Sequence, residues 1–188
     1  TYNNYGAASA SMGDNVYLVG GGSGGPTSGT YVYSISGGSW TTGNAVPSPY
    51  LLGAYNVAGN YLYLVGSYGA SPQNGAHSAS SVLNGAKSAS IQAPDSNTTA
   101  VQRLDLTTGT WSTGPTWTQA RADAGLAYDP ATDTLYFLGG DANNGSYFDS
   151  TALVDEYTLS SWPGGAFVAS TPNLPIQRQA AECGFYST

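Results

Sequence analysis

Few side chains in this sequence of 188 residues are of types that could carry chemistry. His77 is the single histidine and stands beside Ser78, but no acidic neighbour is there to orient it as the base of a Ser-His-Asp triad. The segment Asp141-Ala142-Asn143-Asn144-Gly145 alternates oxygen-bearing side chains before a glycine. Its spacing differs from that of an EF-hand calcium loop, and no acidic residue closes it. We therefore expect no catalytic residue, no metal and no cofactor.

Cys183 is the only cysteine, so a disulfide within the chain is excluded. A small buried residue on a strand is the simplest interpretation. Pairing with a cysteine outside this chain and a reactive thiol are the alternatives. The glycine-rich stretch Gly20–Gly25 is not followed by a helix, so it lacks the helix N-terminus that a phosphate-binding loop needs.

Charge and hydropathy exclude other classes of function. The net charge is −7, and the four basic residues are Lys87, Arg103, Arg121 and Arg178. Nucleic acid binding requires several basic side chains to neutralise phosphates, so that partner is not expected. The longest apolar runs are about six residues, whereas a membrane-spanning helix needs roughly 20. We expect no membrane span.

The composition favours a secreted or cell-surface protein, because it is acidic, rich in Thr, Ser, Tyr and Gly, and almost free of Lys. Two N-glycosylation sequons occur, at Asn97 and at Asn144. Chance matches are also expected in a chain this rich in Asn, Ser and Thr. No signal peptide is recognisable at the N-terminus, which is consistent with a mature product or an excised piece.

The residues that must position any site belong to a threefold repeat. Val16–Gly21, Leu62–Ser67 and Leu135–Gly140 each form a short β-rich run that ends at glycine. Each run is followed by a turn-rich loop, a second β-rich run and a tryptophan. No segment has apolar residues at helical spacing. The repeat therefore predicts an all-β protein built from four-stranded antiparallel units.

A single domain over residues 1–188 is expected, with units at about 6–50, 51–121 and 122–178. The second unit carries a low-complexity insertion at 67–99, and an extra strand at 179–187 resembles the start of a fourth unit. Trp40 and Trp162 are expected to open the fourth strands of the first and third units. A loop as long as the insertion is uncommon in a compact domain.

The repeat resembles the kelch repeat, in which a hydrophobic strand ends in Gly-Gly and a Tyr-bearing strand precedes a turn and Trp. The residues that carry the resemblance are Tyr17, Gly20, Gly21, Tyr33 and Trp40, then Tyr63, Gly66, Leu104, Gly109 and Trp111, then Tyr136, Gly139, Gly140, Tyr157 and Trp162. The resemblance implies that each unit is one blade of a β-propeller. The repeated Tyr and Trp residues are then expected to pack blade against blade.

Three blades and one extra strand do not close a ring, because propellers have about four to eight blades. The chain is therefore either part of a longer propeller or half of a six-bladed ring made by two copies. Its open sheet edge needs a partner or a cover. The missing blades or a second copy are thus expected partners.

The resemblance also implies that ligands bind on the loops of one face. These loops are 20–30, 66–99 and 139–150, together with the connections around Tyr50, Trp117 and Arg178. The weak candidates for ligand contacts are Tyr50, Trp117, Arg121, Arg178, Asp141 and Asn143. Arg121 and Arg178 match a family position just before the first strand of a blade, where Arg can meet a carboxylate. Tyr50 stands at this position in the second unit.

The sequence therefore predicts a non-catalytic binding module whose ligand is a protein or a carbohydrate. One alternative is a structural subunit that assembles through its open blade edges into a ring or filament. Another is an accessory domain of a larger secreted enzyme. Some kelch-like propellers belong to copper oxidases, but one histidine cannot supply such a metal site, so that activity is not carried over.

Overall fold

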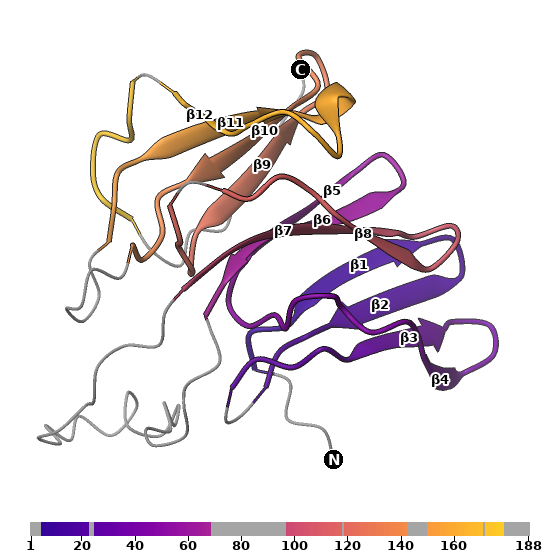
Figure 1. Ribbon diagram of the computed structural model, residues 1–188. Helices are drawn as coiled ribbons and strands as arrows, with labels where there is room; N and C mark the ends of the chain where they lie inside the picture. The colour runs from indigo at the N-terminus through magenta and orange to yellow at the C-terminus, as the bar shows by residue number, and fades with distance from the viewer. Residues whose placement is uncertain are drawn as a thin grey trace, which may run out of the picture.

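The chain folds into three four-stranded antiparallel sheets that stand side by side as blades (Figure 1). The computed structural model describes residues 5–22, 25–68, 97–117, 119–142, 150–170 and 172–178. Blade 1 contains β1 (Ala8–Met12), β2 (Asn15–Val19), β3 (Thr30–Ser34) and β4 (Ser39–Thr42); blade 2 contains β5 (Ala54–Ala58), β6 (Tyr61–Ser67), β7 (Thr98–Asp105) and β8 (Thr110–Thr113); blade 3 contains β9 (Gly125–Asp129), β10 (Thr134–Leu138), β11 (Val154–Thr158) and β12 (Val168–Ala169). The expected all-β fold with propeller blades is confirmed, and the three blades do not close a ring.

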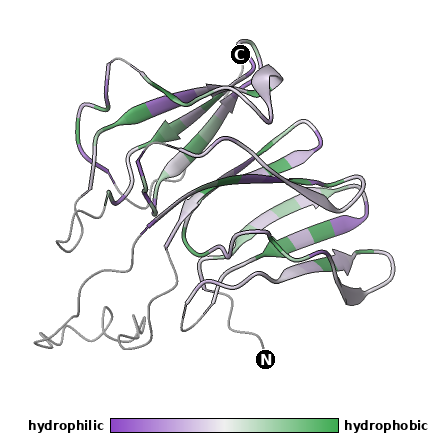
Figure 2. Ribbon diagram, in the orientation of Figure 1, coloured by the Kyte–Doolittle hydropathy of each residue, from purple (hydrophilic) through white to green (hydrophobic). Residues whose placement is uncertain are grey.

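Each blade is a meander in which neighbouring strands follow one another in sequence. The tight hairpins explain this order, because short turns such as Met12 to Asn15 and Ala58 to Tyr61 join strands that must pair antiparallel. The three repeated runs form the second strands, β2, β6 and β10. Hydrophobic stretches lie along the strands of all three sheets (Figure 2).

The fourth strand of blade 3 begins later than expected. A three-residue 3-10 helix, η1 (Leu159–Ser161), follows β11, and β12 starts at Val168 rather than at Trp162. Pro163 follows the tryptophan and has no N–H to give to a sheet ladder. The flexible pair Gly164-Gly165 comes next. Pairing therefore resumes only where β-branched Val168 meets Glu156.

Burial along the second strands shows how the blades stack. In β6, which belongs to the middle blade, Leu62 to Ser67 are all buried. In β2 only alternate residues, Tyr17 and Val19, are buried, and in β10 Leu135 and Phe137 are buried whereas Tyr136 is half-buried. Side chains alternate between the two faces of a strand. Blade 2 is therefore covered on both faces. Blades 1 and 3 each cover one face of blade 2, and within the described residues no blade packs on their other faces.

Two hydrophobic clusters fill the spaces between blades. The cluster between blades 1 and 2 contains Ala8, Ala10, Tyr17, Val19, Val46, Tyr50, Leu62, Leu64, Leu104 and Leu106. The cluster between blades 2 and 3 contains Ala54, Ala58, Tyr63, Val65, Val101, Trp117, Ala124, Leu126, Leu135, Phe137, Tyr157 and Phe167. Burial of a large apolar side chain is worth roughly 1.5–3 kcal/mol. The expectation that repeated Tyr residues pack between blades is met by Tyr17, Tyr63 and Tyr157.

Several residues considered from the sequence lie outside the described ranges. They are Lys87 and His77 in the insertion, Asn143 and Asn144 after β10, and Cys183 in the expected extra strand. Within the described ranges, no helix has the length and hydrophobicity needed to cross a membrane.

Candidate functional site

The glycines that end the second strands fix the connections between blades. The backbone carbonyls of Tyr50, Arg121 and Arg178 lie where a Cβ on Gly20, Gly66 and Gly139, respectively, would stand. All three glycines have positive φ, which side-chain-bearing residues rarely adopt. The next N–H completes the contact in two blades, where Gly21 donates to the Tyr50 carbonyl and Gly140 to the Arg178 carbonyl, each at 2.7 Å. The three residues therefore occupy equivalent positions, as the sequence predicted.

Arg121 lies in the core between blades 2 and 3. Its side chain is fully buried and forms an ion pair with the Asp155 carboxylate. It also donates to the carbonyls of Gly139 at 2.8 Å and Leu153 at 3.2 Å. Burial lowers the pKa of Arg121 to about 9, so the guanidinium stays charged at neutral pH. The expected meeting of this Arg with a carboxylate is found, but the carboxylate belongs to the chain itself.

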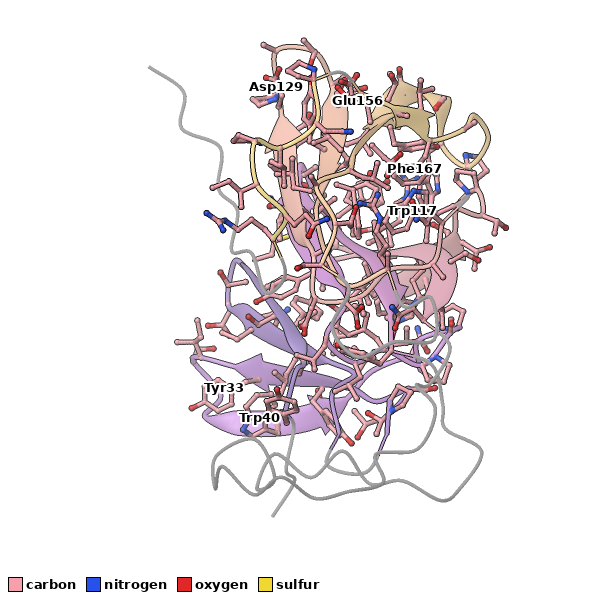
Figure 3. The ribbon with its side chains drawn as sticks, turned by 90° about the vertical axis from the view of Figure 1, so that its left-hand side faces the viewer. Tyr33, Trp40, Trp117, Asp129, Glu156 and Phe167 are labelled. Carbon is pink, nitrogen blue, oxygen red and sulfur yellow. The ribbon has the colours of Figure 1, made fainter. Side chains whose placement is uncertain are left out.

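Trp117 and Tyr50 are also packed rather than displayed. The Trp117 ring lies 3.8 Å from the Phe137 ring and 5.7 Å from the Phe167 ring, centroid to centroid. Trp117 and Phe167 are labelled in Figure 3. The Tyr50 hydroxyl donates to the Gly53 carbonyl at 2.5 Å. Both residues are 1% exposed and hold the blades together. Arg178 is exposed on the connection after blade 3.

Four polar side chains converge where the loops of blades 2 and 3 meet. The Tyr68 hydroxyl lies 3.3 Å from Asp123 Oδ2 and 3.4 Å from Asp141 Oδ2. Asn97 donates from Nδ2 to the Asp141 carbonyl at 2.7 Å. Backbone hydrogen bonds between Ala122 and Asp141 hold the two acidic segments together. We call Tyr68, Asn97, Asp123 and Asp141 the polar cluster.

The surroundings of Asp123 and Tyr68 disfavour the ionised form of each side chain. Burial, and then the charge of Asp141, raise the pKa of Asp123, whereas the hydrogen bond from Tyr68 acts in the opposite direction. Burial and the two carboxylates raise the pKa of Tyr68, so its phenol remains protonated. Asp123 also has a φ of 48°, in the left-handed region that Asp and Asn tolerate better than most residues. The cluster thus concentrates negative charge in a partly desolvated place.

A groove runs beside the polar cluster along the edge of blade 2. It is lined by Ser48, Asn97, Thr98, Thr99, Ala100, Val101, Gln102, Thr113, Gly114 and Thr116. Gln102 shapes one wall, because its side-chain amide accepts from the Ser48 N–H at 3.0 Å and donates to the Ser48 carbonyl at 2.8 Å. The lining contains hydroxyl and amide groups and no charged side chain. Asn97 belongs to both the groove and the polar cluster.

Asn97 is only 8% exposed, and its Nδ2 is used in the bond to Asp141. A glycan on this nitrogen would replace that hydrogen bond. The second sequon, at Asn144, lies outside the described residues.

Sequence reasoning selected Asp141 and missed Tyr68 and Asp123. The repeat itself contained the missing signal. Tyr68 stands two residues after Gly66, as Asp141 stands two residues after Gly139. Asp123 stands two residues after Arg121, as Leu52 stands after Tyr50, and Leu52 and Asp123 both have positive φ. Tyr68 and Asp141 thus come from one position of the repeat, and Asp123 comes from a second.

Charged groups that could hold a metal are sparse in the described part of the chain. Within it, no group of three or more His, Cys, Asp or Glu side chains is arranged as a metal site. The polar cluster contains two carboxylates, and its remaining oxygens are those of a phenol and an amide.

Comparison with known proteins supports the blade architecture. A model described as "Kelch motif" matches residues 4–46, which include all of blade 1. A solved structure entitled "Structure of YjhT" superimposes with a TM-score of 0.64 at 14% sequence identity, covering 92% of this chain and 52% of that chain. The chain therefore spans about half the length of that structure, and the likeness concerns the fold. No curated protein matches the sequence.

Proposed function

Because its first blade is a kelch motif and its three sheets share the propeller fold, we propose that this chain is a non-catalytic binding module. A kelch motif on blades of this kind supports an interaction role in general. The proposed setting is the secreted or cell-surface one that the acidic, Lys-poor composition favours. The proposed ligand is a protein or a neutral carbohydrate.

The groove on blade 2 is the observation that carries the proposal. Its hydroxyl and amide groups come from the start of β7, the end of β8 and the connection at Ser48. Such groups pair with sugar hydroxyls or with a peptide backbone and offer no charge to an ionic ligand. Rigid strands supply most of the lining, and a site on strands is held more precisely than a site on loops.

Blocking the groove tests the proposal. Thr113 ends β8 and is exposed at the groove, so Thr113→Lys places a long cationic side chain there. Thr42 holds the equivalent position at the end of β4 in blade 1, away from the groove, and Thr42→Lys is the matched control. We expect Thr113→Lys to lose at least tenfold in affinity for a ligand found with a panel of neutral glycans and extracellular protein domains. Equal affinities of the two variants would contradict the groove as the site.

A second candidate function is a structural subunit, and Trp40 favours it. Trp111 pairs with Leu104 in blade 2 as Trp40 pairs with Tyr33 in blade 1. The Nε1 of Trp111 donates to the Asn44 carbonyl of blade 1 at 3.0 Å. Trp162 of blade 3 likewise packs on Tyr63 of blade 2. Trp40 holds this position in blade 1, where the described residues place no blade before it, and is 55% exposed. A further blade or a second copy is therefore proposed to cover it.

A further inference from the structure

The outer edge of blade 2 has backbone groups that face away from the sheet. β8 is the last strand of this blade, and among the described strands it pairs only with β7. Gly114, just after β8, donates its N–H to the Val101 carbonyl at 2.8 Å. Along an antiparallel ladder, residue pairs that exchange hydrogen bonds alternate with pairs that do not. The register therefore assigns the outward N–H and C=O groups to Trp111 and Thr113.

This edge lacks the features that usually prevent the addition of another strand. Charged residues, prolines and bulges on an edge strand discourage pairing with a second chain. The sequence of β8 is Thr-Trp-Ser-Thr, and its pairing with β7 is regular. The edge of blade 3 differs, because β12 has only two residues and the connection before it contains Pro163. A strand can therefore be added to blade 2 more readily than to blade 3.

The groove begins where β8 ends, and its wall already binds polypeptide backbone. Thr113, Gly114 and Thr116 line this end of it. Elsewhere in the lining, the Gln102 amide bonds to both the N–H and the carbonyl of Ser48. The edge strand β4 of blade 1 has a similar sequence, but none of its residues lines the groove. The groove therefore distinguishes the edge of blade 2 from that of blade 1.

The lining favours an uncharged peptide over a sugar. No lining residue carries a charge, although the net charge of the chain is −7, and none has an aromatic ring. Pockets for small molecules are usually lined by hydrophobic and aromatic side chains. An extended peptide instead needs backbone partners about 7 Å apart, which is the distance between alternate residues of a strand. Trp111 and Thr113 have this spacing along β8.

We propose that the groove binds an uncharged, extended peptide segment of a partner protein, which adds to blade 2 as a fifth strand beside β8. This inference rests on the proposed function, because it assigns a ligand to the same groove. Backbone hydrogen bonds to Trp111 and Thr113 hold the segment, and the groove receives one of its side chains. Pro115 has no N–H and ends the free ladder, so the added strand is short.

Backbone N-methylation of the peptide tests the added strand directly. The probes are heptapeptides with blocked ends, built from Thr, Ser, Val and Tyr and screened for binding to the purified chain. The tightest binder is then remade with N-methyl groups on its odd-numbered or on its even-numbered residues. Because only alternate residues bond to one neighbouring strand, we expect one set to bind at least tenfold more weakly and the other to bind as before. Equal affinities of the two sets, or no heptapeptide that binds, would overturn the added strand.

Thr113→Pro tests the same edge from the side of the protein. It removes an outward N–H, and proline is tolerated on an edge strand where the N–H faces solvent. Thr42→Pro is the matched control, because Gly43 donates to the Thr30 carbonyl at 2.8 Å and the same alternation turns the Thr42 N–H outward in blade 1. We expect both variants to keep the Tm of the unsubstituted chain, and Thr113→Pro alone to bind the heptapeptide at least tenfold more weakly. Equal affinities of the two variants would overturn the assignment to this edge.

Failure of this inference is distinguishable from failure of the proposed function. If a neutral glycan binds and Thr113→Lys weakens its binding, while no heptapeptide binds, the groove is still the binding site and the added strand is wrong. If a heptapeptide binds with the expected N-methyl pattern, but neither Thr113→Lys nor Thr113→Pro changes its affinity, the groove is wrong as well.

Discussion

Arg121 shows at the residue scale how this chain uses its few charges. Of the three arginines, it alone is fully buried, and among the described residues it alone forms an ion pair. It also stacks on Trp117 with its guanidinium carbon 4.3 Å from the ring centroid. Arg103 instead lies over the Tyr61 and Trp162 rings, at 4.0 and 4.5 Å. The contact of Arg103 with Trp162 joins blade 2 to blade 3, and the ion pair of Arg121 with Asp155 joins the connection between these blades to blade 3. Scarce basic residues are thus placed between blades, where cation–π contacts gain from desolvation.

Removing the Arg121 charge is expected to destabilise the fold strongly. Arg121→Met leaves the Asp155 carboxylate buried without its counter-charge, which costs about 3–5 kcal/mol. The double variant Arg121→Met/Asp155→Leu removes both charges and should recover most of that loss. The free energy of unfolding in urea measures both effects. If the single variant lost less than about 1 kcal/mol, or the double variant recovered nothing, the ion pair would not be what holds this position.

The sequence predicted the residue positions better than their exposure. The resemblance correctly placed Tyr50, Arg121 and Arg178 at equivalent points, since each carbonyl meets the glycine that ends the second strand of the preceding blade. It could not show that Tyr50 and Arg121 are covered while Arg178 is exposed. That difference depends on whether another blade packs over the residue, and one chain read in order contains no such information.

At the scale of the elements, the glycine that ends each second strand tolerates substitution least. Gly66 and Gly59 both have positive φ, but a Cβ on Gly66 would meet the Arg121 carbonyl, whereas nothing lies within 4 Å of a Cβ on Gly59. Gly59→Ala should therefore cost only about 1 kcal/mol for the left-handed backbone. Gly66→Ala adds overpacking against main chain and should cost about 1–3 kcal/mol more.

Thermal or urea unfolding of the two alanine variants measures this difference. Because both changes remove the same freedom of glycine from the unfolded chain, their comparison isolates the contact with Arg121. Equal losses of stability in the two variants would mean that the connection at Arg121 moves away from residue 66 without an energetic cost. Such a result would weaken the explanation given for the repeated glycine.

Strand positions were largely predictable because β-rich runs and turn residues alternate clearly in all three units. The last strand of blade 3 was not. Trp162 was expected to open it, but the tryptophan instead packs in a connection, against Tyr63 and against Gly114 of blade 2. A tryptophan buries a large area wherever it lies. Packing against blade 2 therefore determines the position of Trp162, and β12 begins only at Val168, five residues beyond Pro163.

At the scale of the whole molecule, the open face of blade 3 differs in charge from the corresponding covered face of blade 2. On blade 2, Arg103 pairs with Tyr63 across the sheet and lies under Trp162 of the next blade. Glu156 holds the same position on blade 3, since it pairs with Tyr136 in the same way. If a second copy covered blade 3 with its own blade 1, Glu156 would lie beneath Trp40. A carboxylate there is costly to bury and cannot make the cation–π contact that Arg103 makes.

We therefore expect copies of the chain to associate weakly, and Glu156→Arg to strengthen the association by recreating the stack of Arg103 on Trp162. Sedimentation equilibrium at micromolar concentrations should show a shift from 19.2 kDa toward twice that mass for the Glu156→Arg variant. Adding Trp40→Ser to this variant should reverse the shift, because it removes the ring that the arginine would meet. Trp40→Ser alone should change the free energy of unfolding by less than about 0.5 kcal/mol, as expected for an exposed side chain. Association that persists after Trp40→Ser would assign the contact to another surface, and a monomer in every variant would mean that the open faces require blades of a different sequence.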